Sequence, residues 1–258
     1  MMSRRVLLLA LAITTALPAF GAEIAAADRR SGYTFMGPDS RAMQDDDTAN
    51  PGMLAVQDGE ALWNAKAGQA NRSCADCHGD ASSMKGIAAR YPIFDKALGR
   101  PVDLEQRINI CRRDHQQASP FANESREQLA VTAFIGRQSR GQPITSRDDE
   151  ALAPFVARGH ALFVQRQGQL NLACANCHED NWDKHLAGSP VTQGQPNGYP
   201  EYRLEWQAMG SLQRRIRSCM TGIRAQALDY GSDDMVALEL YLMSRARGMT
   251  METPAVRP

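Results

Sequence analysis

The sequence is poor in aromatic residues, which make up 6% of its 258 residues. Its 29 basic and 29 acidic side chains give a formal net charge of zero at pH 7, so the charge of the whole chain points to no particular partner. Its N-terminal apolar run, "VLLLALAITTALPAF", is too short for a convincing membrane-spanning helix. No segment alternates apolar and polar residues as a half-buried strand does. We therefore expect no nucleic-acid partner, no membrane span and no sheet-based fold.

The N-terminus has the layout of a secretory signal peptide. Arg4 and Arg5 precede the apolar run, and the small residues of "GAEIAAA" follow it. We expect residues 1–27 to be this signal, with cleavage after Gly21, Ala22 or Ala27. The sequence therefore predicts a soluble periplasmic protein that folds under oxidising conditions.

Two pentapeptides, "CADCH" at residues 74–78 and "CANCH" at residues 174–178, have the spacing of c-type haem attachment. In this chemistry two thiols add to the haem vinyl groups, and the histidine that follows binds the iron. A zinc site or a disulfide beside a histidine is the alternative, but it explains poorly why the motif occurs twice in an exported chain. We predict two covalently bound haem c groups, held by Cys74, Cys77, His78, Cys174, Cys177 and His178.

The two motifs belong to a longer internal repeat. Residues 59–78 and 159–178 share ten identities in twenty positions without a gap. Apolar residues also recur every three or four positions in both halves, which is typical of amphipathic helices. We predict an all-α fold of two tandem duplicated cytochrome c-like haem domains, in which a haem takes the central place that aromatic residues often fill. Further matching segments are 104–111 with 212–219 and 133–141 with 240–248.

The composition suggests where these domains begin and end. The polar stretch "SRGQPITSRDDE" indicates a linker, and a Gly/Pro-rich loop at residues 187–200 occurs only in the second half. The segment after the signal has little apolar periodicity, so it is either a partner-binding or wrapping segment or a disordered tail. The predicted parts are a signal peptide (1–27), an N-terminal extension (28–49), a first haem domain (50–141), a linker (142–149) and a second haem domain (150–258).

Each half also contains one further cysteine, Cys111 or Cys219, at the same position of the repeat. A haem iron with histidine on one side has methionine, histidine, cysteine or an open site on the other. Only cysteine recurs at equivalent positions, so we predict that Cys111 and Cys219 are the distal thiolate ligands, opposite His78 and His178. A disulfide between them is the alternative. The competing ligands are Met84 and His115 in the first half and His185, Met209, Met220, Met235 and Met243 in the second.

The segment around Cys219 is locally basic. No acidic residue occurs between Glu205 and Asp229, whereas four arginines do. Such a field suits a dianionic substrate, although arginines also commonly neutralise haem propionates. The arginines are Arg214, Arg215, Arg217 and Arg224.

Arginine alone does not define a substrate site, because Arg107 occupies the position equivalent to Arg215 in the first half. The two halves differ after the lone cysteine. "CRRDHQ" is bulky and contains Asp114, whereas "CMTGIR" offers Thr221 and Gly222 and therefore more room for a sulfur ligand.

With these motifs the chain resembles the SoxA family, the dihaem subunits of the SoxAX cytochromes of sulfur-oxidising bacteria. The resemblance rests on both CxxCH motifs, on "INICRRDHQ" and on "RRIRSCMTGIR", and it continues through "NPGMLAVQDGEALW" and "MVALELYLMSRARGM". It implies an L-cysteine S-thiosulfotransferase, which joins thiosulfate to a cysteine of the carrier SoxYZ and releases two electrons through haem. It also implies that Cys219, which can carry a persulfide sulfur, and Arg215, which contacts the anionic substrate, are catalytic. The implied partners are a monohaem SoxX subunit and a soluble cytochrome c acceptor.

Two other functions fit the same motifs. A noncatalytic dihaem electron-transfer cytochrome would need no sulfur substrate, and a thiosulfate dehydrogenase would form tetrathionate from thiosulfate alone. Peroxidase activity fits less well, since a distal cysteine would have to leave the iron before peroxide could bind. Modification of the carrier thiol distinguishes the transferase from these alternatives.

Overall fold

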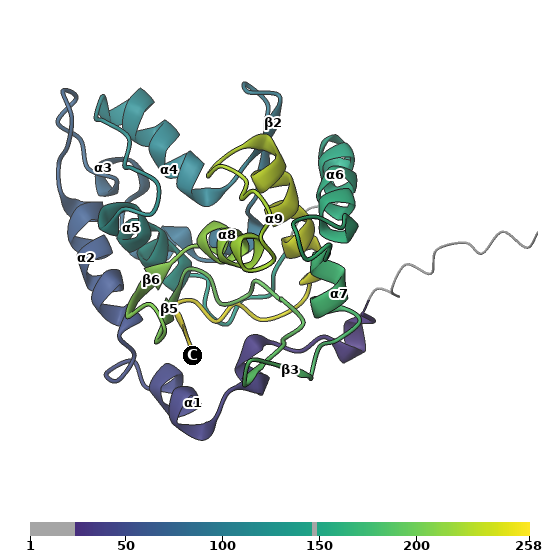
Figure 1. Ribbon diagram of the computed structural model, residues 1–258. Coiled ribbons are helices and arrows are strands. Elements are labelled where there is room, and N and C mark those ends of the chain that lie inside the picture. Colours follow the sequence, from purple (N-terminus) through teal and green to yellow (C-terminus); the bar gives the residue numbers. More distant parts are fainter. Residues whose placement is uncertain (1–23, 146–148) are drawn as a thin grey trace, which may run out of the picture.

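The computed structural model describes residues 24–145 and 149–258, so most of the predicted signal peptide lies outside the described residues. Helices dominate the described chain, and the order of its elements is repeated (Figure 1). The first half contains α2 (Gly52–Asn64), α3 (Ala75–His78), β1 (Ile93–Asp95), β2 (Arg100–Val102), α4 (Leu104–Cys111) and α5 (Arg126–Arg137). The second half contains α6 (Ala153–Val164), α7 (Cys174–His178), β5 (Glu201–Arg203), β6 (Ala208–Gly210), α8 (Leu212–Gly222) and α9 (Asp233–Arg245).

The remaining elements are short. They are α1 (Pro38–Asp45), β3 (His185–Leu186), β4 (Ser189–Pro190) and β7 (Ala255–Arg257). The single turns are η1 (Ala26–Asp28), η2 (Gly32–Phe35), η3 (Ala81–Met84), η4 (Ala88–Arg90), the π-helical η5 (Arg112–Gln116) and η6 (Glu150–Leu152). Among the helices of the described residues, none is both long and apolar enough to cross a membrane.

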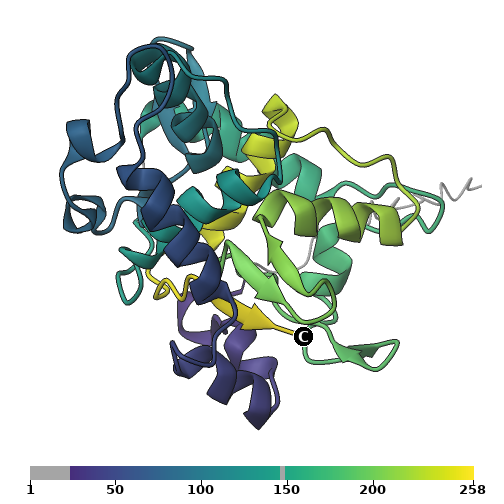
Figure 2. The same cartoon turned by 90° about the vertical axis from the view of Figure 1, so that its left-hand side faces the viewer.

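Each half is built on a pair of packed helices. α2 packs against α5, and α6 packs against α9 (Figures 1 and 2). A Cβ atom on Gly59 would lie 2.1 Å from the carbonyl oxygen of Ala130, and one on Gly159 would lie 2.1 Å from that of Ala237. Because no side chain fits at either crossing, glycine lets the two backbones touch. The duplication seen in the sequence is therefore also present in the helix packing.

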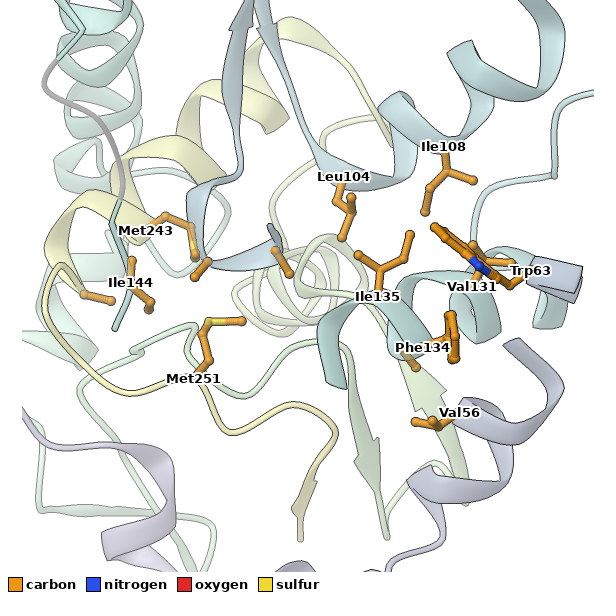
Figure 3. Close-up of a cluster of buried hydrophobic side chains, with 14 residues drawn as sticks. Val56, Trp63, Leu104, Ile108, Val131, Phe134, Ile135, Ile144, Met243 and Met251 are labelled. Atoms are coloured by element: carbon orange, nitrogen blue, oxygen red, sulfur yellow. The ribbon is translucent and has the colours of Figure 1, made fainter. Parts of the chain in front are cut away.

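The two halves share part of their hydrophobic core. One cluster joins Trp63 and Phe134 of the first half to Ile144, Met243 and Met251, which follow later in the chain (Figure 3). Burying a large apolar side chain contributes roughly 1.5–3 kcal/mol, so these contacts hold the halves together. A second cluster lies within the second half and contains Leu162, Phe163, Ala175, Leu212, Ile216, Met220, Met235, Leu238, Tyr241 and Leu242.

The prediction of an all-α fold is confirmed for the dominant helices but misses several short strands. The hairpins β1–β2 and β5–β6 are equivalent and lead into α4 and α8, while β3–β4 lies in the Gly/Pro-rich loop. β7 pairs in parallel with β5, which places Val256 opposite Tyr202. Strands of two or three residues are too short to show an alternating pattern, and the partner of β7 is distant in sequence. Periodicity could therefore not reveal these sheets.

The predicted N-terminal extension, residues 28–49, wraps around the C-terminal strand. Gln44 is buried, and its Oε1 accepts a hydrogen bond from the backbone N–H of Val256 at 3.1 Å. Just beyond the extension, Asn50 Nδ2 donates to the carbonyl oxygen of Pro254 at 2.9 Å. The segment is therefore packed against the C-terminal residues, as expected of a wrapping segment. Its role in partner binding stays a prediction.

The predicted linker, residues 142–149, is packed against the protein where it begins. Ile144 is buried, and its carbonyl oxygen accepts a hydrogen bond from the N–H of Gly248 at 3.0 Å. Residues 146–148 lie outside the described residues. The division of the chain into two haem domains at this linker stays a prediction.

Candidate haem-binding and active site

Both haem-attachment motifs fold into a single helical turn, α3 for "CADCH" and α7 for "CANCH". A residue between the two cysteines caps each turn. Asp76 accepts a hydrogen bond from the N–H of Ser73 at 2.9 Å, and Asn176 accepts one from the N–H of Ala173 at 3.0 Å. The motif spacing therefore produces the expected local geometry, with two thiols and an imidazole on one turn.

His178 is held in the protonation state that can bind a metal. Its Nδ1 lies 2.7 Å from the carbonyl oxygen of Thr192. Because a carbonyl oxygen can only accept, Nδ1 carries the proton and Nε2 keeps its lone pair. Burial lowers the pKa of His178, and the positive charges of Arg245 and Arg215 act in the same direction. The imidazole is therefore neutral at neutral pH, as an iron ligand must be.

His78 is oriented by an aromatic neighbour instead. The residue is exposed, and its ring centroid lies 5.6 Å from that of Trp63. Trp63 is buried and donates from Nε1 to the carbonyl oxygen of Gly79 at 3.1 Å. The second half has Phe163 at the position of Trp63 and uses a loop carbonyl for this purpose, so the two histidines are supported differently.

The six cysteines are free thiols and form two groups. The lone cysteine of each half interacts electrostatically with the motif cysteines of its own half. A disulfide between the two lone cysteines therefore finds no support, and their assignment as distal iron ligands stays a prediction. The groups are Cys74, Cys77 and Cys111 in the first half and Cys174, Cys177 and Cys219 in the second.

The methionines that compete as iron ligands are used in packing. Met220, Met235 and Met243 are buried core residues. Met84 and Met209 are partly buried against the first core cluster. The competing histidines, His115 and His185, are both exposed.

α8 presents Arg215 and Cys219 together. Leu212, Ile216 and Met220 repeat every four residues and are buried, so this stripe attaches α8 to the second core cluster. Arg215 and Cys219 are also four residues apart and lie on the neighbouring stripe. The charges of the Cys219 thiolate and the Arg215 guanidinium interact. One helix thus brings the two predicted catalytic residues side by side.

Of the two lone cysteines, only Cys219 is exposed. Thr221 is exposed too, and a Cβ on Gly222 would meet no atom within 4 Å. Cys111 is partly buried, and burial raises the pKa of its thiol. After Cys111 the chain continues into the π-helical turn η5. In the polypeptide itself Cys219 is therefore more accessible than Cys111.

Three of the four arginines near Cys219 already have partners. The guanidinium carbon of Arg214 lies 4.2 Å from the centre of the Trp206 ring, and that of Arg217 lies 4.5 Å from the centre of the Tyr230 ring. Arg224 Nη1 donates to Gln169 Oε1 at 3.4 Å. Within the described parts of the chain, the Arg215 guanidinium takes part in no hydrogen bond or ion pair. Arg215 is thus the arginine that remains available for an external anion.

The absence of acidic residues near Cys219 holds along the chain but not in space. Glu201 and Glu205 interact electrostatically with Arg215, because the β5–β6 hairpin turns back toward α8. Arg203 pairs with Glu201 at 3.2 Å and Glu205 at 3.3 Å. The predicted basic field is therefore partly offset, and the specific position of Arg215 matters more than net local charge.

The equivalent arginine of the first half is neutralised within the protein. Arg107 Nη2 lies 2.5 Å from Asp95 Oδ2 on β1. The two halves align without a gap from the start of each hairpin to the lone cysteine, and Arg203 occupies the position of Asp95 in the second half. The position of Asp95 is therefore occupied by an arginine in the second half, and the hairpin carboxylates Glu201 and Glu205 are paired with Arg203.

Tyr199 and Asp95 belong to no recognisable motif of the sequence, yet both lie beside the predicted site residues. The phenol of Tyr199 interacts with Arg215 and Cys219, and burial raises its pKa well above the usual range, so it stays a neutral donor. Tyr91 has the equivalent place beside Arg107. The available signal was the Tyr-Pro pair that begins both hairpins at the same distance before the lone cysteine.

The two attachment turns, each faced by a further cysteine, define the class of c-type cytochromes, which bind haem covalently. A family profile described as SoxA/TsdA, cytochrome c domain, matches residues 58–144 and 158–251. One match falls in each half of the repeat.

Known relatives identify the family within this class. A Pseudaminobacter salicylatoxidans protein named L-cysteine S-thiosulfotransferase subunit SoxA is 42% identical over 229 residues, which cover 88% of this chain and 80% of that protein. A Rhodovulum sulfidophilum protein of the same name is 36% identical over 229 residues, with the same coverage. A chain in the crystal structure of SoxXA from P. pantotrophus superposes with a TM-score of 0.86 at 36% identity, covering 89% of this chain and 87% of that one. The chain belongs to the SoxA family, which confirms the resemblance inferred from its motifs.

Proposed function

We propose that this chain is the SoxA subunit of an L-cysteine S-thiosulfotransferase, which couples thiosulfate oxidatively to a cysteine of a carrier protein. The observation that carries this proposal is the available guanidinium of Arg215 beside the exposed Cys219, in a chain that matches SoxA proteins over most of its length. A noncatalytic electron carrier has no need of this pair.

The described residues fit two covalently bound haem c groups. In both attachment turns the thiols are free, and the proton on Nδ1 of His178 leaves its Nε2 available for iron. Bound haem supplies the one-electron acceptors that the oxidation requires. The residues that would hold haem are Cys74, Cys77, His78 and Cys111 for the first group and Cys174, Cys177, His178 and Cys219 for the second.

Arg215 binds the sulfonate end of thiosulfate. Its planar guanidinium can donate two parallel hydrogen bonds to two sulfonate oxygens, and the neutral phenol of Tyr199, which interacts with the same charges, is a further donor on this side of the protein. The positive charge also offsets the repulsion between the dianion and the anionic sulfur of Cys219. In this orientation the outer sulfur of thiosulfate lies against Cys219, whether that residue is a thiolate or a persulfide.

The reaction forms one S–S bond, between the outer sulfur of thiosulfate and the carrier cysteine. The carrier thiol loses its proton to solvent, and two electrons leave the sulfurs, with a soluble cytochrome c as the final acceptor. The exposure of Cys219 supports this reaction, because a cysteine on another protein must reach the same place.

We infer that the chain works in the periplasm beside a monohaem SoxX-like subunit and meets a SoxYZ-like carrier. The similarity to a chain of a SoxXA structure supports the first partner. The signal-like N-terminus and the haem attachment motifs support the location.

Mass spectrometry of the carrier tests this function. The haem-loaded SoxAX complex is incubated with thiosulfate, SoxYZ and oxidised cytochrome c, and we expect a thiosulfonate adduct on the carrier cysteine. Tetrathionate formed without the carrier would instead indicate a thiosulfate dehydrogenase. Reversible reduction with neither product would indicate an electron carrier.

Two equivalent variants provide the matched control. Cys219→Ala should abolish adduct formation, whereas Cys111→Ala should perturb the spectrum of the first haem and leave much of the coupling intact. An equally complete loss in Cys111→Ala would contradict the placement of catalysis in the second half.

A further inference from the structure

Gln193 ties the second-half loop to the N-terminal segment. It is 0% exposed, and its side-chain amide uses both ends. Oε1 accepts from the backbone N–H of Arg30 at 2.7 Å, and Nε2 donates to the carbonyl oxygen of Asp28 at 3.0 Å. A buried amide paired in this way fixes the two backbone segments relative to each other, because breaking either bond leaves a buried polar group unpaired.

The backbone on either side of this amide leads to His178. The preceding carbonyl, that of Thr192, accepts the hydrogen bond from His178 Nδ1. The carbonyl of Gln193 itself accepts from Arg245 Nη1 at 3.4 Å, and Arg245 Nη2 also lies 3.4 Å from Glu179 Oε1. The loop at residues 192–193 is therefore clamped between the N-terminal segment and α9.

The first half has a different arrangement at the equivalent positions. Gly79 stands where the second half has Glu179, and Gln138 stands where it has Arg245. His78 is exposed and lies against Trp63. The clamp is thus specific to the second half, where the proposed active site lies.

We propose that Gln193 is a positioning residue for the second haem, which holds the Thr192 carbonyl on His178 by anchoring it to residues 28–30. The proposal rests on the proposed attachment of haem at "CANCH". A hydrogen bond at Nδ1 makes the imidazole a stronger electron donor through Nε2 and so favours the oxidised iron. The N-terminal segment is in this way a component of the second haem site, although it is far from His178 in sequence.

Redox titration of the haem-loaded full chain, followed by electron paramagnetic resonance, tests the proposal. Cys219→Met first assigns the signals of the second haem. In Gln193→Ala we expect the potential of the second haem to rise and its spectrum to change, with the first haem unaltered. Trypsin should also cleave after Arg29 or Arg30 several-fold faster than in the wild type.

A truncated chain that begins at Gly32 is the second test variant, for use if Gln193→Ala folds poorly. It keeps Gln193 but lacks both of its partners, so the potential of the second haem should rise in it as well. The matched control is Gln44→Ala, because Gln44 is also buried but ties the N-terminal segment to β7. An unchanged second-haem potential in both test variants would overturn the proposal, as would an equal shift in Gln44→Ala. Sulfur transfer by the wild type is measured separately, so its absence would count against the proposed function alone.

Discussion

Arg107 and Arg215 show how a single carboxylate changes the role of a side chain. Each arginine lies four residues before the lone cysteine of its half, Arg107 on α4 and Arg215 on α8. Arg107 is paired with Asp95, whereas Arg215 has Arg203 at the corresponding place on its hairpin. An arginine already bound to a carboxylate would have to give up that pair to bind an anion, so only Arg215 can receive thiosulfate at low cost.

Substitution of Arg215 should therefore impair substrate binding specifically. Charge-assisted hydrogen bonds contribute about 1.5–3 kcal/mol each, so Arg215→Ala should lower kcat/KM for thiosulfate by at least about tenfold. Arg215→Lys should lose less, because it keeps the charge but not the paired geometry. The measurement is steady-state coupling to the carrier, with both haems shown to be attached by mass.

Arg107→Ala is the control at the equivalent position and should leave the KM for thiosulfate near the wild-type value. Wild-type kcat/KM in Arg215→Ala would reassign this arginine to a haem propionate. The binding role would then have to come from another group.

At the scale of elements, the fold depends on how closely the paired helices approach. Gly159 on α6 faces the backbone of α9, and Gly59 on α2 faces that of α5. α2 contacts the attachment turn α3 as well as α5, and α6 contacts the attachment turn α7 as well as α9. A change in the spacing of a helix pair therefore shifts the helix against which the haem-attachment turn packs.

Gly159→Ala should destabilise the protein even though alanine favours helices by about 1 kcal/mol over glycine. The new methyl group would lie 2.1 Å from the carbonyl oxygen of Ala237 and 2.6 Å from the Cβ of Tyr241. Overpacking of this kind costs roughly 1–3 kcal/mol. Denaturant unfolding of the haem-loaded chain measures the change.

Gly222→Ala provides the comparison, since Gly222 also lies in a helix and a Cβ at this position of ordinary φ meets nothing within 4 Å. Its free energy of unfolding should not fall below the wild-type value. If Gly159→Ala were as stable as Gly222→Ala, close contact of α6 with α9 would not be needed.

For the whole molecule, the junction of the two halves contains the buried carboxyl group of Asp103 and the partly buried ones of Glu105 and Glu239. Gln213 Nε2 donates to Asp103 Oδ2 at 2.7 Å and to Glu239 Oε2 at 3.0 Å, and so links α8 to the start of α4 and to α9. Glu105 and Glu239 also line a small cavity between the halves. Burial, followed by the charge of Asp103, raises the pKa of Glu239 to about 8.

This junction should make stability depend on pH. Glutamate in an unfolded chain titrates near pH 4.3, so between that pH and about 8 the folded state binds more protons than the unfolded state. The contribution of Glu239 is therefore fully present at low pH and is lost as the pH rises through about 8. One group of this kind gives a slope of up to ~1.4 kcal/mol per pH unit, and Glu239→Gln should reduce the slope.

Denaturant unfolding from pH 5 to pH 9 measures this slope. Asp234→Asn on the same helix is the control, because the ion pair with Arg158 lowers the pKa of Asp234 and confines its effect to acidic pH. An identical pH profile for the wild type and Glu239→Gln would show that Glu239 ionises at little cost in the folded state.

Features that depend on local spacing or on repetition could be predicted from the amino-acid sequence alone. The CxxCH motifs become single helical turns because five consecutive residues contain the whole geometry. The duplication identified Cys111 and Cys219 as equivalent, and the resemblance to the SoxA family singled out Arg215, four residues before Cys219. These inferences required no knowledge of how distant segments meet.

Contacts between distant segments establish which of the equivalent groups are available and how the second histidine is held. Asp95 neutralises Arg107 because a hairpin folds back on α4, and the Thr192 carbonyl reaches His178 because a loop crosses over α7. The pairing of β7 with β5 is likewise a contact between distant segments. Electrostatic and hydrogen-bond energies depend on distance in space, which residue spacing along the chain does not contain.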